Sequence, residues 1–266
     1  MWPWIQIGDL SFPAFLLVQS LNAALLLAWA KSRASHLDLS PRVALDLVLT
    51  ILISGLIGGR LLHVVWEAPQ FYLENPEAIF HLMSGGYVYF GGLAAGLGAG
   101  VLFLRFRQEG PQLGRWFDFV APLASLGTGL GRIGCFFAGC CYGKVCLLPW
   151  AFPFPDEKGL SFLRHPTQLY SVIWELGVLA ILLGLEKIPA KNRPRWLRPA
   201  GALFLTWIGL HSIGRFFIEF LRDDFRGPVL YLSISQWLSV CALIITCLVL
   251  RRISSHRSET SAKPAQ

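Results

Sequence analysis

The chain has 266 residues, of which 54% are hydrophobic and 15% are charged. Soluble domains have about 45–50% apolar and about 25% charged residues, so this composition excludes an ordinary soluble protein and indicates an integral membrane protein. The net charge of +7 could suggest a nucleic-acid binder, but the basic residues lie between apolar segments and therefore report membrane topology instead.

Seven apolar segments approach or reach the length of about 20 residues that a bilayer requires. They cover residues 10–30, 43–65, 90–104, 117–137, 168–185, 200–221 and 233–250. The sequence therefore predicts an all-α integral membrane protein with about seven transmembrane helices, formed as one domain by residues 1–253. The start of the chain lacks the basic residues of a signal peptide, so we expect the first helix to insert uncleaved. The polar tail, residues 254–266, is expected to be disordered.

Charge alternates between the two sets of loops. Basic residues gather in segments 31–42, 105–115, 187–198 and 251–263, whereas segment 66–83 is acidic. Because basic loops remain in the cytoplasm, this pattern predicts a cytoplasmic C-terminus and an N-terminus on the outer side. The two ends lie on opposite sides only if the number of spans is odd, which agrees with seven.

Three arginines lie inside predicted spans: Arg60, Arg132 and Arg215. An arginine at the centre of a bilayer costs about 2.5 kcal/mol or more, so each needs a compensating partner. Arg60 follows two glycines, which allow another backbone to approach closely. For Arg60, an ion pair with another helix and a role in ligand binding remain open alternatives.

Arg132 lies within a glycine-rich stretch, residues 125–143. The glycines of this stretch are Gly127, Gly129, Gly131, Gly134, Gly139 and Gly143. Glycine removes side chains from a helix face, so another backbone or a lipid headgroup can come close. A guanidinium group binds phosphate in a planar, bidentate fork, and the stretch therefore predicts a lipid-phosphate site. The alternative is a close-packed helix whose arginine pairs internally or extends to the membrane surface.

The motif RHPTQLY, residues 164–170, precedes the fifth span. Its proline and threonine suit the start of a helix, and Tyr170 suits the aromatic belt at the membrane surface. These features alone describe a helix entry. The motif also predicts that Arg164, His165 and Gln168 lie at the mouth of a polar cavity on the outer side.

A charged stripe ends the sixth span. His211, Arg215, Glu219 and Arg222 are spaced 4, 4 and 3 residues apart, which places them on one helix face. The other faces are rich in phenylalanine, isoleucine and leucine, so the stripe is expected to face a polar cavity. Glu219 is expected to hold Arg215 or Arg222 in place.

Together these motifs resemble those of the bacterial prolipoprotein diacylglyceryl transferases. The similarity rests on GRIGCFFAGCCYG, RHPTQLY, GRFFIEFLR and SISQWLS, with GLIGGRLLHVV and SGGYVYFGGL in the second and third spans. It implies seven transmembrane helices with a small periplasmic head, in the bacterial inner membrane. The enzymes of the family move the diacylglyceryl group of phosphatidylglycerol to the thiol of a lipobox cysteine, and they release glycerol 1-phosphate. The implied partners are phosphatidylglycerol, prolipoprotein signal peptides with a lipobox cysteine, and membrane lipids, with no nucleic acid.

The resemblance implies that Arg132 and Arg215 are the essential lipid-handling arginines. It also implies supporting roles for Gly143, Glu219 and Arg222. The wider set of residues expected to bind substrate adds Gly131, Gly134, Arg60, His165, Gln168 and Tyr170.

The expected reaction requires neither a cofactor nor a metal. A free thiol has a pKa near about 8.5 and must lose its proton before it attacks the glyceryl carbon. Negative charge then grows on the leaving phosphate, where fixed guanidinium groups stabilise it. The sequence contains no Walker-type loop and no HExxH motif.

The chain departs from the family pattern at several polar positions. Cys135, Ala138 and Cys140 replace polar residues of the family, and Phe90 stands where the family usually has histidine. With that histidine absent, we expect His211, one helical turn from Arg215, to accept the proton of the incoming thiol.

Four of the six cysteines form the pattern C-x4-C-C-x4-C, at positions 135, 140, 141 and 146. A metal site is one alternative, but the spacing matches no standard zinc pattern. Small packing residues, with a Cys141–Cys146 disulfide on the oxidising outer side as one option, are the favoured interpretation.

Two other functional classes remain alternatives. A glycine-broken helix with intramembrane arginines also suits a transporter of lipid or anionic substrates, although such proteins often carry internal repeats and this sequence shows none. A paralogue that binds lipid without transferring it would keep the same arginines.

Overall fold

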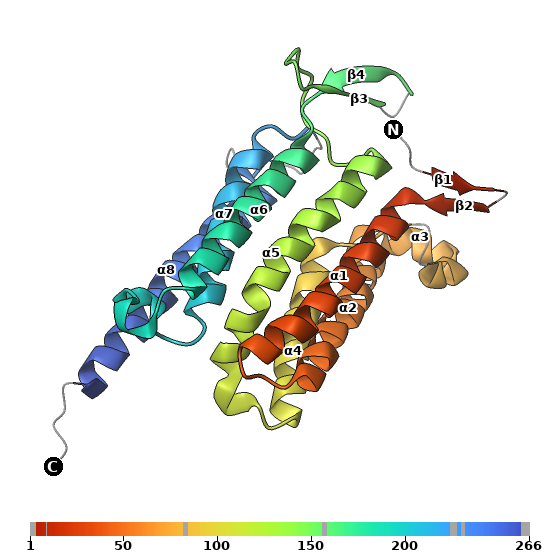
Figure 1. Cartoon of the computed structure of the whole chain (residues 1–266). Helices are drawn as coiled ribbons and strands as arrows, with labels where there is room; N and C mark the ends of the chain where they lie inside the picture. Colours follow the sequence, from red (N-terminus) through yellow and green to blue (C-terminus); the bar gives the residue numbers. More distant parts are fainter. Residues whose placement is uncertain are drawn as a thin grey trace. The chain divides into compact units, whose positions relative to one another are not determined.

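The computed structural model describes residues 4–8, 10–81, 85–155, 159–223, 228–229 and 232–261. These residues are mainly helical and include three two-stranded antiparallel hairpins. The chain divides into two compact units, Met1–Ala24 with Gly114–Gln266 and Leu25–Leu113 (Figure 1).

The first unit contains four long helices, the start of a fifth, and all three hairpins. Its elements are β1 (Trp4–Ile7), β2 (Leu10–Pro13), the start of α1 (Ala14–His36), α5 (Leu113–Ala138), β3 (Phe152–Pro155), β4 (Ser161–Arg164), α6 (Thr167–Glu186), α7 (Ala202–Glu219), β5 (Pro228–Val229), β6 (Leu232–Ser233) and α8 (Ile234–Ser261). The second unit contains the rest of α1, then α2 (Pro41–Leu62), a π-helical turn (His63–Glu67), α3 (Pro69–Glu74), a 3-10 turn (Pro76–Phe80) and α4 (Tyr89–Phe106).

Seven long helices of the described residues occupy the seven predicted spans. Six of these helices are long and apolar enough to cross a membrane. The seventh, α7, is outside that set because His211, Arg215 and Glu219 reduce its hydropathy. The chain is therefore an all-α, multi-pass membrane protein.

The ends of the helices differ from the prediction at both termini. Residues 10–13 form β2 rather than the start of the first span, and α1 begins only at Ala14. The reason is Pro13, because a proline disfavours the helical conformation in the residue before it and has no N–H group to donate a helical hydrogen bond. At the other end, α8 continues as far as Ser261, into the segment that was expected to be a disordered tail.

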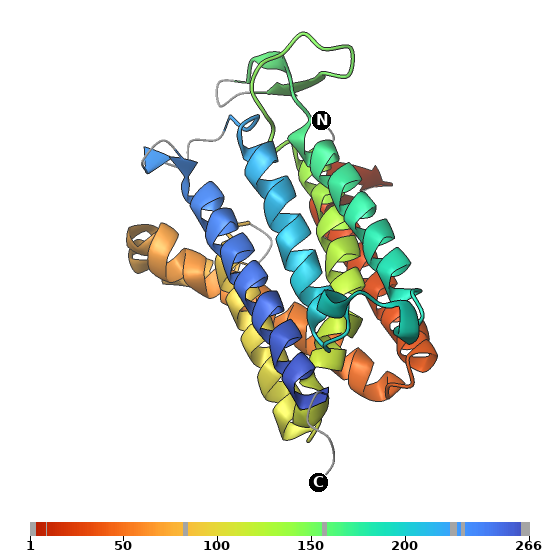
Figure 2. The same ribbon diagram turned by 90° about the vertical axis from the view of Figure 1, so that its left-hand side faces the viewer.

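Helices α6, α7 and α8 lie side by side in the first unit, with α7 in contact with both neighbours (Figure 2). Asp118 of α5 fixes the start of α7, because its carboxylate accepts hydrogen bonds from the backbone N–H groups of Gly201, Leu203 and Phe204 at 2.8, 2.9 and 3.1 Å. A carboxylate at a helix N-terminus satisfies unpaired N–H groups and interacts favourably with the helix dipole. This cap sets how far along α5 the polar end of α7 lies.

Helices α2 and α4 of the second unit pack through glycines. A Cβ atom at Gly58 would lie 2.6 Å from the Gly91 carbonyl oxygen, and one at Gly92 would lie 2.9 Å from the Gly55 carbonyl oxygen. Only glycine permits this separation of two backbones, which is typical of helix pairs in membranes.

The loop after α5 lies at the end of the first unit where α5 and α7 finish and α6 and α8 begin. It continues into the β3–β4 hairpin, which extends beyond the helices (Figure 1). This small head and the helix ends beneath it contain most of the predicted site residues.

Candidate active site

Arg132 lies on the side of α5 that faces α6. It stands seven residues, about two turns, after Ser125, whose hydroxyl donates to the Glu175 carbonyl oxygen of α6 at 2.8 Å. A Cβ atom at Gly129, between them, would lie 3.2 Å from the Glu175 Cβ atom. The Arg132 side chain is half-buried, and among the described residues no hydrogen bond or ion pair engages its guanidinium group. A half-buried guanidinium group without a hydrogen bond or ion pair from the described residues is suited to bind an anion.

The neighbouring glycines of Arg132 face α1 instead. The Gln19 side chain donates to the Gly131 carbonyl oxygen at 3.2 Å, and a Cβ atom at Gly134 would lie 3.1 Å from the Phe15 ring. Asn22 donates to the Gly127 carbonyl oxygen at 2.9 Å. These glycines allow α1 to pack against α5, so the structure assigns them to the support of the Arg132 helix.

Glu219 joins the arginines at the end of α7. Its carboxylate lies 2.7 Å from the Arg215 guanidinium and 3.7 Å from that of Arg222, and it accepts a hydrogen bond from the Ser233 hydroxyl at 3.0 Å. Arg215 also donates to the Ser235 hydroxyl at 3.1 Å. The prediction that Glu219 holds either arginine is confirmed for both.

Gly143 brings the loop after α5 against the end of α7. Its N–H group donates to the His165 carbonyl oxygen at 2.8 Å, and it forms a β-bridge with Arg222. A Cβ atom at Gly143 would lie 2.7 Å from the Cβ of His165 and 2.9 Å from Cγ2 of Thr167. No other residue fits between α6 and α7 here, so Gly143 positions Arg222 through the backbone.

The motif after β4 holds the same loop by its carbonyl groups. The Thr167 hydroxyl donates to the Cys141 carbonyl oxygen at 2.7 Å, and the Gln168 amide donates to the Cys140 carbonyl oxygen at 2.6 Å. Both side chains are 1% exposed. Gln168 is therefore buried beneath the loop and does not lie at the open cavity mouth that the sequence predicted. Thr167, which the sequence indicated only as the start of a helix, also positions this loop.

His165 and Tyr170 form a polar chain at the beginning of α6. The Tyr170 hydroxyl lies 3.1 Å from Nδ1 of His165 and accepts a hydrogen bond from the Trp150 indole at 2.9 Å. Arg164 is buried in the head, where it forms an ion pair with Asp223 and lies over the Tyr142 ring. Arg164 is thus a structural residue of the head.

His211 is held by a carboxylate that sequence reasoning missed. Its Nδ1 lies 2.5 Å from Oε1 of Glu175, and the Ser125 hydroxyl oxygen lies 3.0 Å from the other carboxylate oxygen. The Glu175 side chain is buried, at 3% exposure. An acidic residue in the middle of the apolar sequence of α6 was the available signal, because such residues are costly in a membrane.

Arg60 belongs to the second unit and is engaged by backbone. Its five N–H groups donate to the carbonyl oxygens of Ala78, Ile79, His81, Gly85 and Gly86. The guanidinium carbon also lies 5.2 Å from the centre of the Tyr72 ring. In the described part of the chain, Arg60 forms no ion pair with another helix and has no donor left for a ligand, since the loop carbonyls use every donor.

The cysteines are all unpaired, so the optional Cys141–Cys146 disulfide is not present. The Cys141 thiol instead lies 3.3 Å from that of Cys140, and both lie close to the Cys135 thiol. Hydrogen bonding with the Cys135 and Cys140 thiols, assisted by the charges of Arg222 and Arg132, holds the pKa of Cys141 below its usual range. Arg132 and Arg222 therefore both lie near enough to act on the charge of the Cys141 thiol.

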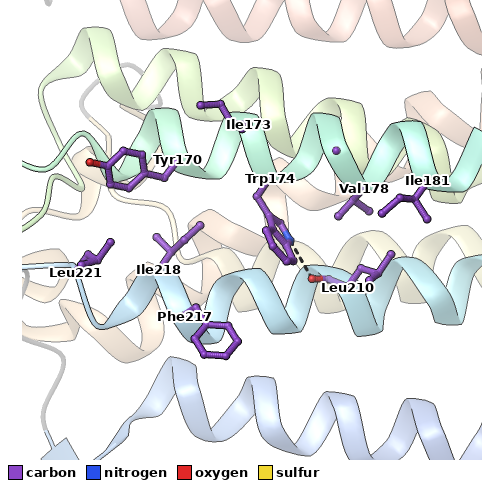
Figure 3. Close-up of a pocket in the computed structure, with 10 residues that line it drawn as sticks. Tyr170, Ile173, Trp174, Val178, Ile181, Leu210, Phe217, Ile218 and Leu221 are labelled. Atoms are coloured by element: carbon purple, nitrogen blue, oxygen red, sulfur yellow. Dashed lines mark hydrogen bonds between the residues drawn. The ribbon is translucent and has the colours of Figure 1, made fainter. Parts of the chain in front are cut away.

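An apolar groove runs along the surface between α6 and α7. It has a volume of about 450 Å³ and is lined by residues such as Ile173, Val178 and Phe217, with Tyr170 at one end (Figure 3). The Trp174 indole points across the groove and donates to the Leu210 carbonyl oxygen at 3.0 Å. The groove thus leads from an apolar membrane surface to the polar group of His165 and Tyr170.

Comparisons with known proteins identify the family of the chain. Residues 4–252 match the model of a family described as prolipoprotein diacylglyceryl transferase. A phosphatidylglycerol–prolipoprotein diacylglyceryl transferase of Bordetella parapertussis is 35% identical over 244 residues, 89% of this chain and 88% of that protein. Proteins of the same name from Geobacter sulfurreducens and Clostridium tetani are each 34% identical, over 83% and 73% of this chain and 81% and 74% of their own lengths. The match of nearly the whole chain shows that it belongs to the prolipoprotein diacylglyceryl transferase family.

Proposed function

We propose that this protein transfers the diacylglyceryl group of phosphatidylglycerol to the lipobox cysteine thiol of prolipoproteins, the first step of bacterial lipoprotein maturation. The names of its relatives state both substrates. The single observation that carries the proposal is the Arg132 guanidinium, half-buried in a membrane helix and engaged by none of the described residues. The phosphate of phosphatidylglycerol supplies the anion that this group lacks.

The reaction requires one bond to form and one to break at the glyceryl carbon. The thiolate sulfur attacks the CH2 group bonded to phosphate, the C–S bond forms, and the C–O bond electrons leave with glycerol 1-phosphate. Charge on the phosphate increases from one negative charge toward two. Arg132, with Arg222 near the same thiol loop and Arg215 fixed by Glu219, provides positive charge where that increase occurs.

His211 is proposed to accept the proton of the incoming thiol. When Glu175 accepts the hydrogen bond of the Nδ1–H group, the lone pair of the ring lies at Nε2, and the carboxylate stabilises the imidazolium that forms. The sequence argument for His211 was that Phe90 replaces the usual histidine of the family. The contact with Glu175 supports it, because this contact would orient the His211 ring.

The groove between α6 and α7 is proposed to hold an acyl chain of the lipid donor. Its lining is almost entirely apolar, and its polar end carries Tyr170 next to His165. The proposed location is the bacterial inner membrane, with the N-terminus on the periplasmic side and the C-terminus in the cytoplasm. This orientation is supported by the basic loops, and under it the head and the ends of α5 and α7 with Arg132, Arg215 and Arg222 are proposed to face the periplasm.

Purified protein tests the proposal directly. It is incubated with phosphatidylglycerol vesicles and a lipobox peptide, and transfer is followed by the shift of the peptide on a gel and by the release of glycerol 1-phosphate. We expect both signals together, and neither with a peptide whose lipobox cysteine is replaced by serine. Binding of phosphatidylglycerol without modification of the peptide would instead indicate a lipid-binding paralogue, and lipid movement across the vesicle without modification would indicate a transporter.

A further inference from the structure

Three thiols meet at the end of α5. The Sγ atoms of Cys135, Cys140 and Cys141 all lie within 4.8 Å of one another, and those of Cys140 and Cys141 are 3.3 Å apart. Zinc thiolates have bonds of about 2.3 Å, which separates the sulfurs of a tetrahedral site by about 3.8 Å. The three sulfurs already have separations close to those that one shared ion requires.

The backbone explains why the spacing of these cysteines in the sequence concealed the cluster. Gly139 has φ +72°, the left-handed conformation that ends many helices and reverses the chain. The Cys140 N–H group then donates to the Cys135 carbonyl oxygen at 3.2 Å. The reversal returns Cys140 and Cys141 onto the last turn of α5, so a spacing that is typical of no zinc motif still brings three thiols together.

Cys141 is also held in a conformation that cysteine seldom adopts. Its φ is +65°, which costs roughly 1–2 kcal/mol for a residue other than glycine. The buried Thr167 and Gln168 side chains fix the carbonyl groups on both sides of this residue. The loop that carries two of the three thiols is therefore positioned by α6 rather than by the thiols themselves.

A disulfide accounts for the cluster less well than a metal. Neighbouring residues have Cα atoms about 3.8 Å apart, below the usual range of about 4.4–6.8 Å for a disulfide, so Cys140 and Cys141 are poorly suited to bond to each other. A bond between Cys135 and either of them leaves one thiol unused. A thiophilic ion engages all three.

Two further features suit a metal complex. Three thiolates and a divalent ion carry one net negative charge, and Arg132 and Arg222 lie near enough to act on the Cys141 thiol. In addition, Oε1 of Gln168 is buried without a hydrogen-bond partner in the described part of the chain, although the same amide donates to the Cys140 carbonyl oxygen. A buried acceptor of this kind needs a donor, and a water in the fourth position of the metal would supply one.

We infer that Cys135, Cys140 and Cys141 form a three-thiolate site for a thiophilic ion of the zinc class, with an open fourth position. The bound ion joins the end of α5 to the loop that α6 holds, beside Arg132. Thiolate ligands select such ions over magnesium or calcium, which prefer oxygen. The transfer step as proposed above uses no metal, so the ion is assigned a structural role in the loop beside Arg132.

The test uses the full-length protein in detergent, reduced, loaded with Zn²⁺ and then freed of unbound ions. Elemental analysis is expected to find about one zinc per chain, and Co²⁺ in its place is expected to show intense thiolate-to-cobalt charge-transfer absorption. The variants Cys140→Ser and Cys141→Ser are expected to lose both signals. Two matched controls are expected to keep the zinc and the cobalt signal. They are Cys146→Ser, at the next cysteine in the sequence but outside the cluster, and Cys247→Ser, on α8.

A second measurement needs no variant and therefore does not depend on their folding. In the wild-type protein, Zn²⁺ is expected to slow alkylation of Cys135, Cys140 and Cys141 at least tenfold and to leave that of Cys241 unchanged. Zinc retention by the Cys140→Ser/Cys141→Ser protein would overturn the inference. So would alkylation that Zn²⁺ does not affect, or a wild-type protein that, purified without reductant, has lost two of these thiols to a disulfide.

Discussion

The three intramembrane arginines differ in how the chain satisfies them. Arg60 has every donor bound to loop carbonyls, and Arg215 is paired with Glu219 and Ser235. Arg132 alone of the three has no hydrogen bond or ion pair in the described part of the chain. An uncompensated guanidinium in a membrane is costly, so its persistence suggests that a ligand completes it.

Arg132 and Arg215 are expected to respond differently to replacement by alanine. Arg132→Ala should reduce transfer by about 10²–10³-fold and leave the melting temperature in detergent nearly unchanged, because no internal partner is lost. Arg215→Ala should reduce both transfer and the melting temperature, since it leaves the buried Glu219 carboxylate with the more distant Arg222. Transfer rates and thermal unfolding of the two proteins check this contrast.

Arg132→Lys is the control for charge alone. Lysine cannot form the bidentate fork, so we expect it to restore only a small part of the activity. Transfer at the wild-type rate by Arg132→Ala would contradict the assignment of this residue to the phosphate.

His211 is expected to matter most where the thiol remains protonated. His211→Ala should lose the largest fraction of activity near pH 6 and recover partly toward pH 9, because the acceptor thiol then ionises unaided. Glu175→Gln should show a weaker form of the same profile, since the amide can orient the ring but cannot stabilise an imidazolium. Equal rates for His211→Ala and the wild type across pH 6–9 would show that no proton passes through this residue.

At the scale of elements, α7 carries the polar residues and α6 holds them in position. The sequence predicted the stripe on α7 from its spacing alone, and the structure confirms that Glu219 joins two of its arginines. The partners of Gln168 and Thr167 could not be predicted, because they are backbone carbonyls of a loop that is distant in the sequence. Side-chain patterns indicate which face of a helix is polar, but not which main-chain group it meets.

The α6–α7 groove can be filled without disturbing the fold. Gly177 lines the groove and has open space where a Cβ atom would lie, as does Gly184 farther along α6, which is not part of the groove. Gly177→Leu is expected to raise the phosphatidylglycerol concentration for half-maximal transfer several-fold, with Gly184→Leu unchanged. Equal kinetics for the two variants would exclude an acyl chain from the groove.

At the scale of the whole molecule, the sequence predicted the class and the number of long helices but not their ends. Apolar length is averaged over many residues, so a prediction made from it survives local errors. The start of α1 depended on Pro13 alone, and the cysteine cluster depended on one reversal at Gly139. Features set by a single backbone conformation are the ones that the composition of a segment does not reveal.

Topology is tested with two reporters on the intact chain. A reporter fused after Gln266 is expected to be active in the cytoplasm, and one inserted between β3 and β4 is expected to be active on the periplasmic side. The basic loops of the segments 187–198 and 251–263 give the reason. The opposite pair of signals would place the arginine site on the cytoplasmic side and remove the proposed orientation.

The hydrogen bonds of Arg60 can form only after a later part of the chain has been synthesised. Every carbonyl that it binds lies 18 to 26 residues later in the chain. At about 5–20 residues per second, the ribosome completes those residues roughly 1–5 s after Arg60 has been made. Until those residues have been made, the arginine of α2 has no partner from its own loop. A nascent chain that stops short of residue 78 therefore presents to the insertion machinery a helix with an unsatisfied charge.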